Sequence, residues 1–314
     1  MIYEKKWEDY ALIDTSDGDR LECWGKYILI RPDPQVIWSR KTSDLWNKAD
    51  AVYKRSNSGG GSWDFMKRLP EKWIIKYKPL DLSFEVSPMG FKHMGIFPEQ
   101  AANWNFMHDI LVGATPAERA QPVAPKSNPV YVYTGDRKGR PYEVLNLFAY
   151  TGGATLACAR AGASVCHVDA QKNMINMAKR NAELSGLESA NIRYIADDCV
   201  KFAAREIRRG KKYDAVILDP PSYGRGANGE MWKIEDNLFD LLNMIQELLS
   251  DNPIFVLVNL YTAGLAPSCA GYMLSSIFKS RYGGKVESDE IGIFTESTEI
   301  PFPCGAFSRW INIK

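Results

Sequence analysis

A pair of glycines, Gly152-Gly153, follows an apolar segment, and an aspartate, Asp169, stands shortly after it in the sequence. Glycine lets the backbone pass close to a ligand, and the N-terminus of a following helix offers free N–H donors. A carboxylate at the end of the next strand can accept hydrogen bonds from both hydroxyls of a ribose. Together the two features predict a site for a nucleotide-type cofactor.

The residues before the glycine pair are bulky, which argues against a dinucleotide. The pattern Gly-x-Gly-x-x-Gly is absent, because Phe148 and Tyr150 occupy its earlier positions, and a pyrophosphate would meet their side chains. A sulfonium cofactor carries no phosphate and gains from aromatic faces and acidic groups around its positive charge. We therefore expect a sulfonium cofactor rather than a nicotinamide dinucleotide.

Two further acids, Asp197 and Asp198, follow the third predicted strand. An aspartate there could accept a hydrogen bond from the amino group of an adenine. It could also cap the helix that we expect from Val200 onward, and for Asp198 both interpretations stay open.

The segment Asp219-Pro220-Pro221-Ser222-Tyr223 follows the fourth predicted strand. Two prolines cannot continue a central strand, so the backbone must leave the sheet at its carboxyl edge, where ligands bind in open α/β sheets. A rigid turn at this place would fix backbone carbonyls and an aromatic ring beside the cofactor. We interpret the segment as the part of the site that carries the chemistry.

Alternating strands and helices are expected to position these residues. The predicted strands cover residues 142–148, 164–168, 191–195, 213–218 and 254–260, and the predicted helices cover 153–160, 172–184, 200–209, 234–249 and 267–279. Apolar strands separated by helices indicate a parallel sheet covered on both faces. Two last β-rich segments, 284–293 and 307–313, could pair as a hairpin at the sheet edge.

The chain divides into three parts by pattern. Residues 1–95 read as a small β-rich domain with strands at 27–30 and 73–77, residues 96–140 as a helix and a connecting segment, and residues 141–314 as the cofactor-binding domain. The edge strands of the β-rich domain could pair between subunits, so we hold a homo-oligomer as an open prediction.

The chain resembles class I S-adenosylmethionine-dependent methyltransferases, and more narrowly the bacterial large-subunit ribosomal RNA methyltransferases of the I and K type. The matching residues are Leu147-Phe148-Ala149-Tyr150-Thr151-Gly152-Gly153, Asp169, Asp197, the turn 219–223 and an upstream segment, 91–100. The resemblance covers residues 80 to 314. It implies an α/β fold, a Rossmann-like doubly wound seven-stranded methyltransferase sheet, joined here to the small N-terminal β-rich domain. The RNA-binding (PUA) domain often fused at the start of such enzymes is not evident.

The resemblance also implies roles for particular residues. It implies cofactor contacts for Phe97, Gln100, Phe148, Ala149, Tyr150, Thr151, Gly152, Asp169, Ala170, Asp197, Asp198 and Asp219. It implies a catalytic role in methyl transfer for Asp219, Pro220, Pro221 and Tyr223. It also implies that Ser222, Tyr223 and Arg225 contact the substrate. For Arg225 a solvated loop arginine is the stronger alternative. His93 could orient a ligand or be a hydrogen-bonded structural histidine.

Methyl transfer from a sulfonium is an in-line displacement, so alignment of the nucleophile is the main requirement. Tyr223 could stack on a base that has left its helix. Some relatives place a nucleophilic cysteine after strand five, but Thr262 stands near that place here. Cys199, Cys269 and Cys304 are read as small core residues, so no covalent cysteine intermediate is expected.

Composition sets the remaining limits. The 314 residues carry a formal net charge of +1, which does not by itself favour a polyanionic partner, and the basic run 205–212 reads as a helix end. The six cysteines are scattered, so no metal site is expected, and no apolar run suggests a membrane span or a secretion signal, which predicts a cytoplasmic protein.

The leading hypothesis is methylation of a base nitrogen of ribosomal RNA. The alternatives are methylation of a small molecule or protein, and a cofactor-binding protein without turnover.

Overall fold

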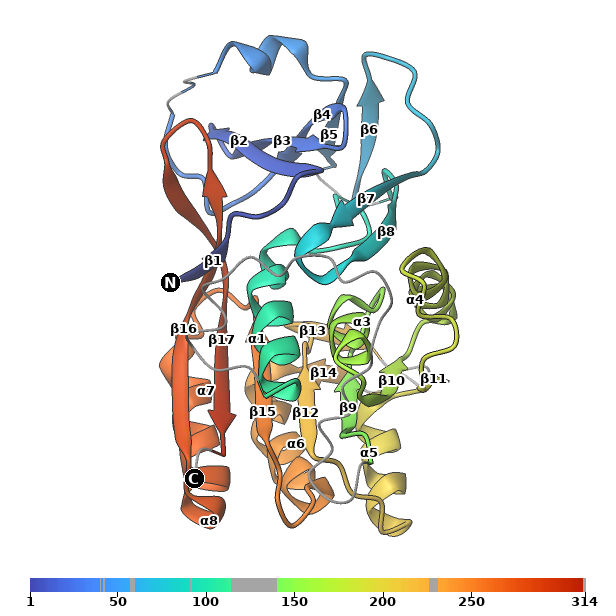
Figure 1. Ribbon diagram of the computed structural model, residues 1–314. Coiled ribbons are helices and arrows are strands. Elements are labelled where there is room, and N and C mark those ends of the chain that lie inside the picture. Colours follow the sequence, from blue (N-terminus) through green and yellow to red (C-terminus); the bar gives the residue numbers. More distant parts are fainter. Residues whose placement is uncertain are drawn as a thin grey trace.

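The computed structural model describes residues 1–39, 41, 43–56, 60–90, 92–113, 140–225 and 231–312. In Figure 1 a group of short strands from the N-terminal part lies above a larger sheet that is flanked by helices. A long hairpin near the C-terminus runs from the lower sheet to the upper strands.

The lower sheet follows from apolar strands that are buried on both faces. In spatial order its strands are β11 (Ile192–Ala196), β10 (Ser164–Asp169), β9 (Glu143–Leu147), β12 (Ala215–Leu218), β15 (Phe255–Leu260), β17 (Ile300–Ile311) and β16 (Lys285–Thr295). The first five run parallel, and β17 is antiparallel to both its neighbours. This order confirms the doubly wound, seven-stranded sheet.

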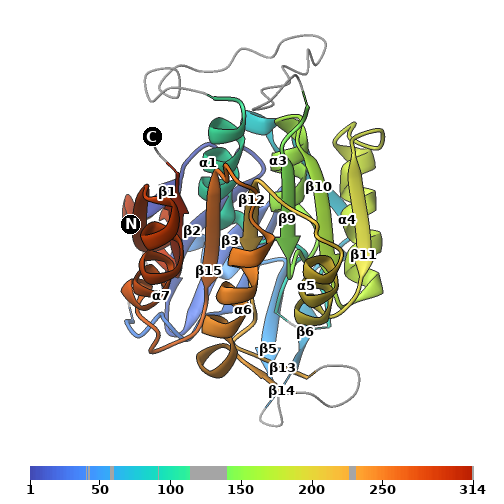
Figure 2. The same cartoon turned by 90° about the horizontal axis from the view of Figure 1, so that it is seen from below.

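Helices cover both faces of the sheet (Figure 2). One face packs against α1 (Ala101–Leu111), α3 (Gly153–Arg160) and α4 (Lys172–Leu184), and the other against α5 (Cys199–Arg208), α6 (Ile234–Leu248) and α7 (Pro267–Leu274). Alternate residues of β12 show the division, because Ala215 and Ile217 join the first cluster and Val216 and Leu218 the second. The expected covered parallel sheet is therefore present.

The N-terminal strands continue the same sheet. They are β2 (Tyr10–Ser16), β3 (Asp19–Trp24), β4 (Tyr27–Pro32), β5 (Ala51–Arg55) and β6 (Gly61–Phe65), with β7 (Trp73–Tyr77) and β8 (Leu82–Val86) as a separate pair. Short 3₁₀ helices are Asp44–Lys48, Lys78–Leu80 and Pro98–Gln100. Asp17 and Gly18 turn the β2–β3 hairpin with positive φ angles of 53° and 83°, a turn that suits Asp-Gly.

The C-terminal hairpin is confirmed, but its predicted place at the sheet edge is wrong. β1 (Ile2–Glu4) pairs with residues 291–293 of β16, and Thr295 of β16 pairs with Leu12 of β2. β16 therefore joins the two groups of strands. The second strand of the hairpin, β17, begins at Ile300 and not at residue 307 as predicted. The hairpin extends past the lower sheet to reach the N-terminal strands.

Two other details differ from the predicted elements. A hairpin of β13 (Tyr223–Arg225) and β14 (Met231–Lys233) follows the turn after β12 and was not predicted. The last long helix divides into α7, a π-helical segment Ser275–Lys279 and α8 (Ser280–Tyr282). The connecting segment lies mostly outside the described residues. Among the described residues, no helix is both long and apolar enough to span a membrane.

Candidate functional site

A cleft opens at the carboxyl ends of β9, β12 and β15, below the segment that precedes α1. Its lining residues are Ile96, Phe97, Gln100, Trp104, Asn146, Phe148, Ala149, Tyr150, Thr151, Gly153, Ala154, Ile217, Asp219 and Asn259. Ligands bind at this edge in open α/β sheets. The predicted residues Phe97, Gln100, Phe148, Ala149, Tyr150, Thr151 and Asp219 are brought together here.

The turn after β9 has an unusual backbone. Phe148 and Tyr150 have positive φ angles of 57° and 49°, which non-glycine residues rarely adopt and which concentrate at functional sites. The Phe148 N–H donates to the Cys199 sulfur over 3.2 Å, and the Tyr150 N–H donates to the Asp169 carboxylate over 2.9 Å. These side chains hold the strained turn in place.

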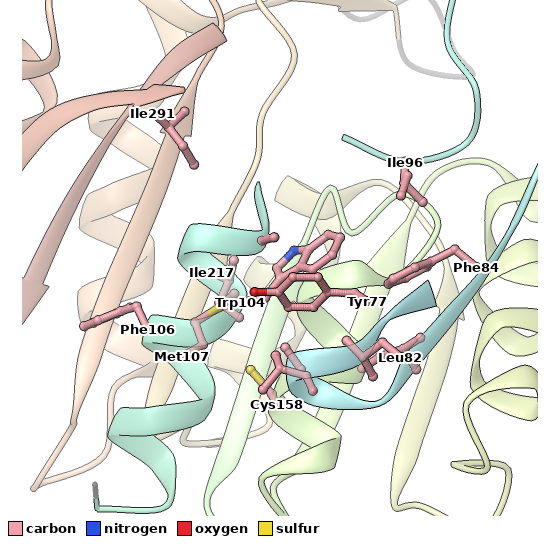
Figure 3. Packing of buried hydrophobic residues seen from close by; sticks show 14 of the residues in the cluster. Tyr77, Leu82, Phe84, Ile96, Trp104, Phe106, Met107, Cys158, Ile217 and Ile291 are labelled. Carbon is pink, nitrogen blue, oxygen red and sulfur yellow. The ribbon is translucent and has the colours of Figure 1, made fainter. Parts of the chain in front are cut away.

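The glycine pair is required by packing as well as by its backbone. Gly152 has a φ of 93° and lies against Ala178, and a Cβ on Gly153 would overlap the Trp104 ring. Figure 3 shows Trp104 within the hydrophobic cluster between α1 and the β7–β8 pair, close to Tyr77. The close approach of α1 to α3 therefore depends on the missing side chain of Gly153.

Asp169 supports the turn beside the cleft. Its two carboxylate oxygens accept hydrogen bonds from the N–H groups of Tyr150 and Gln171, each over 2.9 Å, and burial raises its pKa. Asp169 does not line the cleft itself, and neither do Gly152 and the exposed Ala170. A ribose beyond the turn would have to approach the remaining lone pairs of the carboxylate.

Asp197 and Asp198 have partners within the chain. Asp198 caps α5, since its side chain accepts from the Lys201 N–H over 2.8 Å, so the capping alternative is confirmed. Asp197 forms an ion pair with Arg205 and accepts from the Asp198 N–H. Neither residue lines the cleft. The basic run forms the end of α5, as expected, and Gly210 follows with a φ of 64°.

The segment before α1 brings aromatic rings and a polar network to the cleft. The Phe97 ring lies 5.4 Å from the Tyr150 ring and 5.7 Å from the Tyr261 ring, measured between centroids. The Gln100 amide donates to the Tyr261 hydroxyl over 2.7 Å, and that hydroxyl donates to Glu99 over 3.2 Å. Thr151 ties the glycine turn to this segment through a 2.5 Å hydrogen bond to the Gly95 carbonyl.

Asn103 extends this network to β15. Its amide donates to the Gln100 side chain over 3.0 Å and to the Asn259 side chain over 2.9 Å. Asn259 in turn is hydrogen-bonded to Asp219. The segment before α1, β12 and β15 are therefore connected by side chains under the cleft.

Two carboxyl groups, that of the buried Glu99 and that of the partly buried Asp219, lie close enough to influence each other. Burial, followed by the nearby charge of Glu99, raises the pKa of Asp219 to about 7, against the opposing effect of the hydrogen bond from Asn259. Burial also raises the pKa of Glu99. Such a pair favours a cationic ligand, because a positive charge stabilises both ionised carboxylates.

The sequence analysis did not single out Glu99, Asn103, Asn259 or Tyr261. Asn259 carried a usable signal, since it is a polar residue inside the apolar strand β15, where an amide needs a buried partner. Glu99 belongs to the upstream segment 91–100, which is part of the resemblance to the family. Asn103 and Tyr261 carried no comparable signal.

The turn after β12 lies beside the cleft, with only Asp219 lining it. The Ser222 hydroxyl accepts from Thr262 over 2.6 Å, and Tyr223 is exposed in β13, where its hydroxyl contacts the sulfur of Met231. The predicted residues Pro220, Pro221, Ser222 and Tyr223 therefore do not line the cleft. The side chain of Arg225 and residue Phe91 lie outside what the structure describes.

Thiol, histidine and metal chemistry receive little support at the cleft. None of the six cysteines lines it, and burial raises the pKa of Cys199 and Cys304. Cys269 is exposed, so its interpretation as a core residue was wrong. Burial lowers the pKa of His93 to about 4, so its ring is neutral at pH 7. No cluster of three metal-ligating side chains occurs in the described parts of the chain.

Comparison with known proteins identifies what this arrangement resembles. The family profile described as S-adenosylmethionine-dependent methyltransferase matches residues 134–259. A crystal structure of the SAM-dependent methyltransferase from Agrobacterium tumefaciens is 33% identical, with a TM-score of 0.85, and the alignment covers 99% of this chain and 92% of that one.

Two curated relatives match a shorter region. The ribosomal RNA large subunit methyltransferase I of Aeromonas salmonicida is 31% identical over 43% of this chain and 32% of its own length. The ribosomal RNA large subunit methyltransferase K/L of Shewanella frigidimarina is 34% identical over 39% of this chain and 17% of its own length. The match thus spans a third or less of these curated relatives.

Proposed function

The chain belongs to the S-adenosylmethionine-dependent methyltransferases, and from this premise we propose that it methylates a base nitrogen of ribosomal RNA without a covalent cysteine intermediate. S-adenosylmethionine is the cofactor of the family. The observation that carries the proposal is the turn after β12, whose Asp219 lines the cleft and whose chain continues to the exposed Tyr223.

The residues of the cleft fit a cationic cofactor. Phe97, Phe148 and Tyr150 present aromatic rings, which attract a sulfonium. Glu99 and Asp219 supply carboxyl groups that can stabilise positive charge. We propose that Asp169 accepts the ribose hydroxyls and that Asp197 or Asp198 lies near the adenine. When bound, the cofactor supplies the methyl group on a positively charged sulfur.

The residues of the chain have to align the nucleophile rather than activate a leaving group. An ionised Asp219 can accept a hydrogen bond from a target amino group, as can a backbone carbonyl of the turn. Thr262 stands near the place where some relatives carry a nucleophilic cysteine, and its hydroxyl donates to the Ser222 hydroxyl over 2.6 Å. Neither side chain offers a thiol that could add to a base. The lack of a thiol at these two positions favours direct transfer of the methyl group.

Ribosomal RNA is favoured by the names of the curated relatives and by local charge. Arg55 of β5, Arg68 in the loop after β6 and Lys76 of β7 are exposed, and none forms an ion pair with an acid of the described residues. Such cations can contact phosphates although the net charge of the chain is only +1. Tyr223, which is 49% exposed, offers a ring on which a base can stack.

The test is incubation of the purified protein with labelled cofactor and RNA from cells that lack it. We expect label in ribosomal RNA and, after digestion, a nucleoside methylated on a base nitrogen, identified by mass spectrometry. Protein and small-molecule fractions are assayed in parallel. Label confined to either of them would replace the RNA proposal, and cofactor binding without any label would indicate a protein without turnover.

Two further predictions stand beside this proposal. A cytoplasmic location remains a prediction. The strand β6 ends the sheet among the described strands, so it offers the edge through which two copies could pair. The mass of the protein in solution, measured by light scattering, tests the homo-oligomer.

A further inference from the structure

The β13–β14 hairpin, which follows the turn after β12, carries a tryptophan that contacts both this turn and the turn after β9. The indole N–H of Trp232 in β14 donates to the Pro221 carbonyl over 2.7 Å. The Trp232 ring lies 5.3 Å from the Phe148 ring, measured between centroids. Pro221 belongs to the turn after β12, and Phe148 belongs to the turn after β9 and lines the cleft.

Two backbone carbonyls of the turn accept hydrogen bonds from the residues that follow it. Trp232 occupies the Pro221 carbonyl, and the Ile234 N–H donates to the Ser222 carbonyl over 3.1 Å. Within the described part of the chain, no donor reaches the Pro220 carbonyl. Trp232 thereby fixes the position of the Pro221 carbonyl, which keeps a second lone pair for a further donor.

Phe148 needs support on its side of the contact. Its φ of 57° is strained for a residue with a large side chain, and its N–H is held by the Cys199 sulfur. The ring is also partly buried against Trp232 in the second hydrophobic cluster. Loss of the indole would therefore loosen a residue of the cofactor-binding turn.

We infer that Trp232 is a positioning residue: its N–H fixes the Pro221 carbonyl and its ring fixes Phe148. These two contacts hold the turn after β12 in a fixed position relative to the turn after β9. The inference rests on the proposed function for the identity of the target, but the two contacts do not depend on it. Trp232 itself need not touch either the cofactor or the target.

Two variants separate the two contacts. Trp232→Phe keeps a ring against Phe148 and removes the N–H, so we expect kcat to fall about fivefold to tenfold, as for the loss of one hydrogen bond, with cofactor affinity within about twofold of the wild type. Trp232→Leu removes the ring as well, so we expect a similar loss of kcat and cofactor binding that is weaker by about fivefold in calorimetry.

Trp38→Phe is the matched control. The Trp38 indole N–H also donates to a backbone carbonyl, that of Thr15, over 3.0 Å, and its ring packs on Phe302 at 6.0 Å, remote from the cleft. We expect this variant to retain wild-type kcat and cofactor affinity. Melting temperatures of all three variants show whether a loss reflects unfolding.

Rates are measured on whichever fraction takes up label, so absence of label in RNA rejects the proposed function and leaves this test intact. If no fraction takes up label, calorimetry alone decides. The inference is overturned if Trp232→Phe keeps wild-type kcat, if Trp38→Phe loses as much, or if Trp232→Leu binds the cofactor as tightly as the wild type.

Discussion

The backbone N–H of Tyr150 donates to the carboxylate of Asp169 over 2.9 Å, and this bond joins the glycine turn after β9 to the end of β10. The acid that the spacing singled out as a ribose acceptor therefore also holds the strained turn. A change at Asp169 removes both contributions, so its effects on cofactor binding and on stability have to be measured together.

We expect Asp169→Ala to weaken cofactor binding by more than tenfold and to lower the free energy of unfolding by about 1–3 kcal/mol, since two backbone N–H groups lose their acceptor. Asp169→Asn keeps one side-chain oxygen, so its cofactor affinity and stability should lie between those of Asp169→Ala and the wild type. Calorimetry with S-adenosylmethionine and denaturant unfolding measure the two effects. Equal stability of Asp169→Ala and the wild type would contradict the support of the turn.

The raised pKa of Asp219 predicts an acid limb in the activity profile. Its carboxyl group titrates at about 7 in the folded protein, and only the ionised form attracts a cation and accepts two hydrogen bonds. We expect kcat/KM to rise with pH through about 7, and we expect this limb to be absent in Asp219→Asn. A profile that is flat between pH 6 and 8 in the wild type would contradict the assignment.

The same group predicts how stability changes with pH in the absence of cofactor. The folded protein holds the proton on Asp219 more tightly than the unfolded chain, whose carboxyl titrates near 3.8. Between that value and about 7 the folded state binds more protons, so the contribution of Asp219 to stability falls as the pH rises. Urea unfolding of the wild type and of Asp219→Asn across this range isolates the contribution.

Gly153 predicts a stability effect that depends on space alone. We expect Gly153→Ala to destabilise the protein by about 1–3 kcal/mol, because the new methyl group would overlap the Trp104 ring where α1 meets α3. Gly90→Ala is the control, since a methyl group there meets nothing within 4 Å. Thermal unfolding compares them, and equal melting temperatures would show that Trp104 moves aside freely.

Much of the lower sheet was predictable because each local pattern agreed with the global fold. The helices over 153–160 and 172–184 have the predicted bounds, since apolar spacing, the glycine pair and the helix ends all indicate the same limits. The β16–β17 hairpin was only partly predictable. Its place inside the sheet depends on pairing with β1 and β2, which are almost the whole chain away in sequence.

Some residues of the site were also predictable from the sequence and others were not. The turn 148–152 and Asp219 were visible because glycine, proline and aspartate punctuate apolar strands. Trp232 and Glu99 carried no such signal, since their roles arise from contacts with Phe148, Pro221 and Tyr261 that only the folded chain brings together. The capping role of Asp198 was one of two alternatives that the sequence left open.

The absence of a thiol from the cleft predicts that no protein–RNA adduct forms. Cys199 lies beneath the turn and Cys304 is buried in β17, so Cys199→Ser and Cys304→Ser should keep methyl transfer within about threefold of the wild type, apart from a modest loss of stability. RNA containing 5-fluorocytidine should give no covalent complex on a denaturing gel. A trapped complex that disappears in one of these variants would restore the cysteine route.

Exposed cations of the N-terminal strands predict how RNA binding depends on salt. Arg55→Gln combined with Arg68→Gln should weaken binding uniformly across RNA sequences and reduce the slope of log affinity against log salt by about 1.4 for a single strand, because two phosphate contacts are lost. Lys285→Gln is the control, since Lys285 is exposed on β16 and paired with Glu287 over 2.8 Å. Filter binding between 50 and 200 mM salt measures the slopes. If the control and the double variant shift the slope equally, Arg55 and Arg68 do not contact RNA phosphates, and both are ordinary solvent-exposed cations.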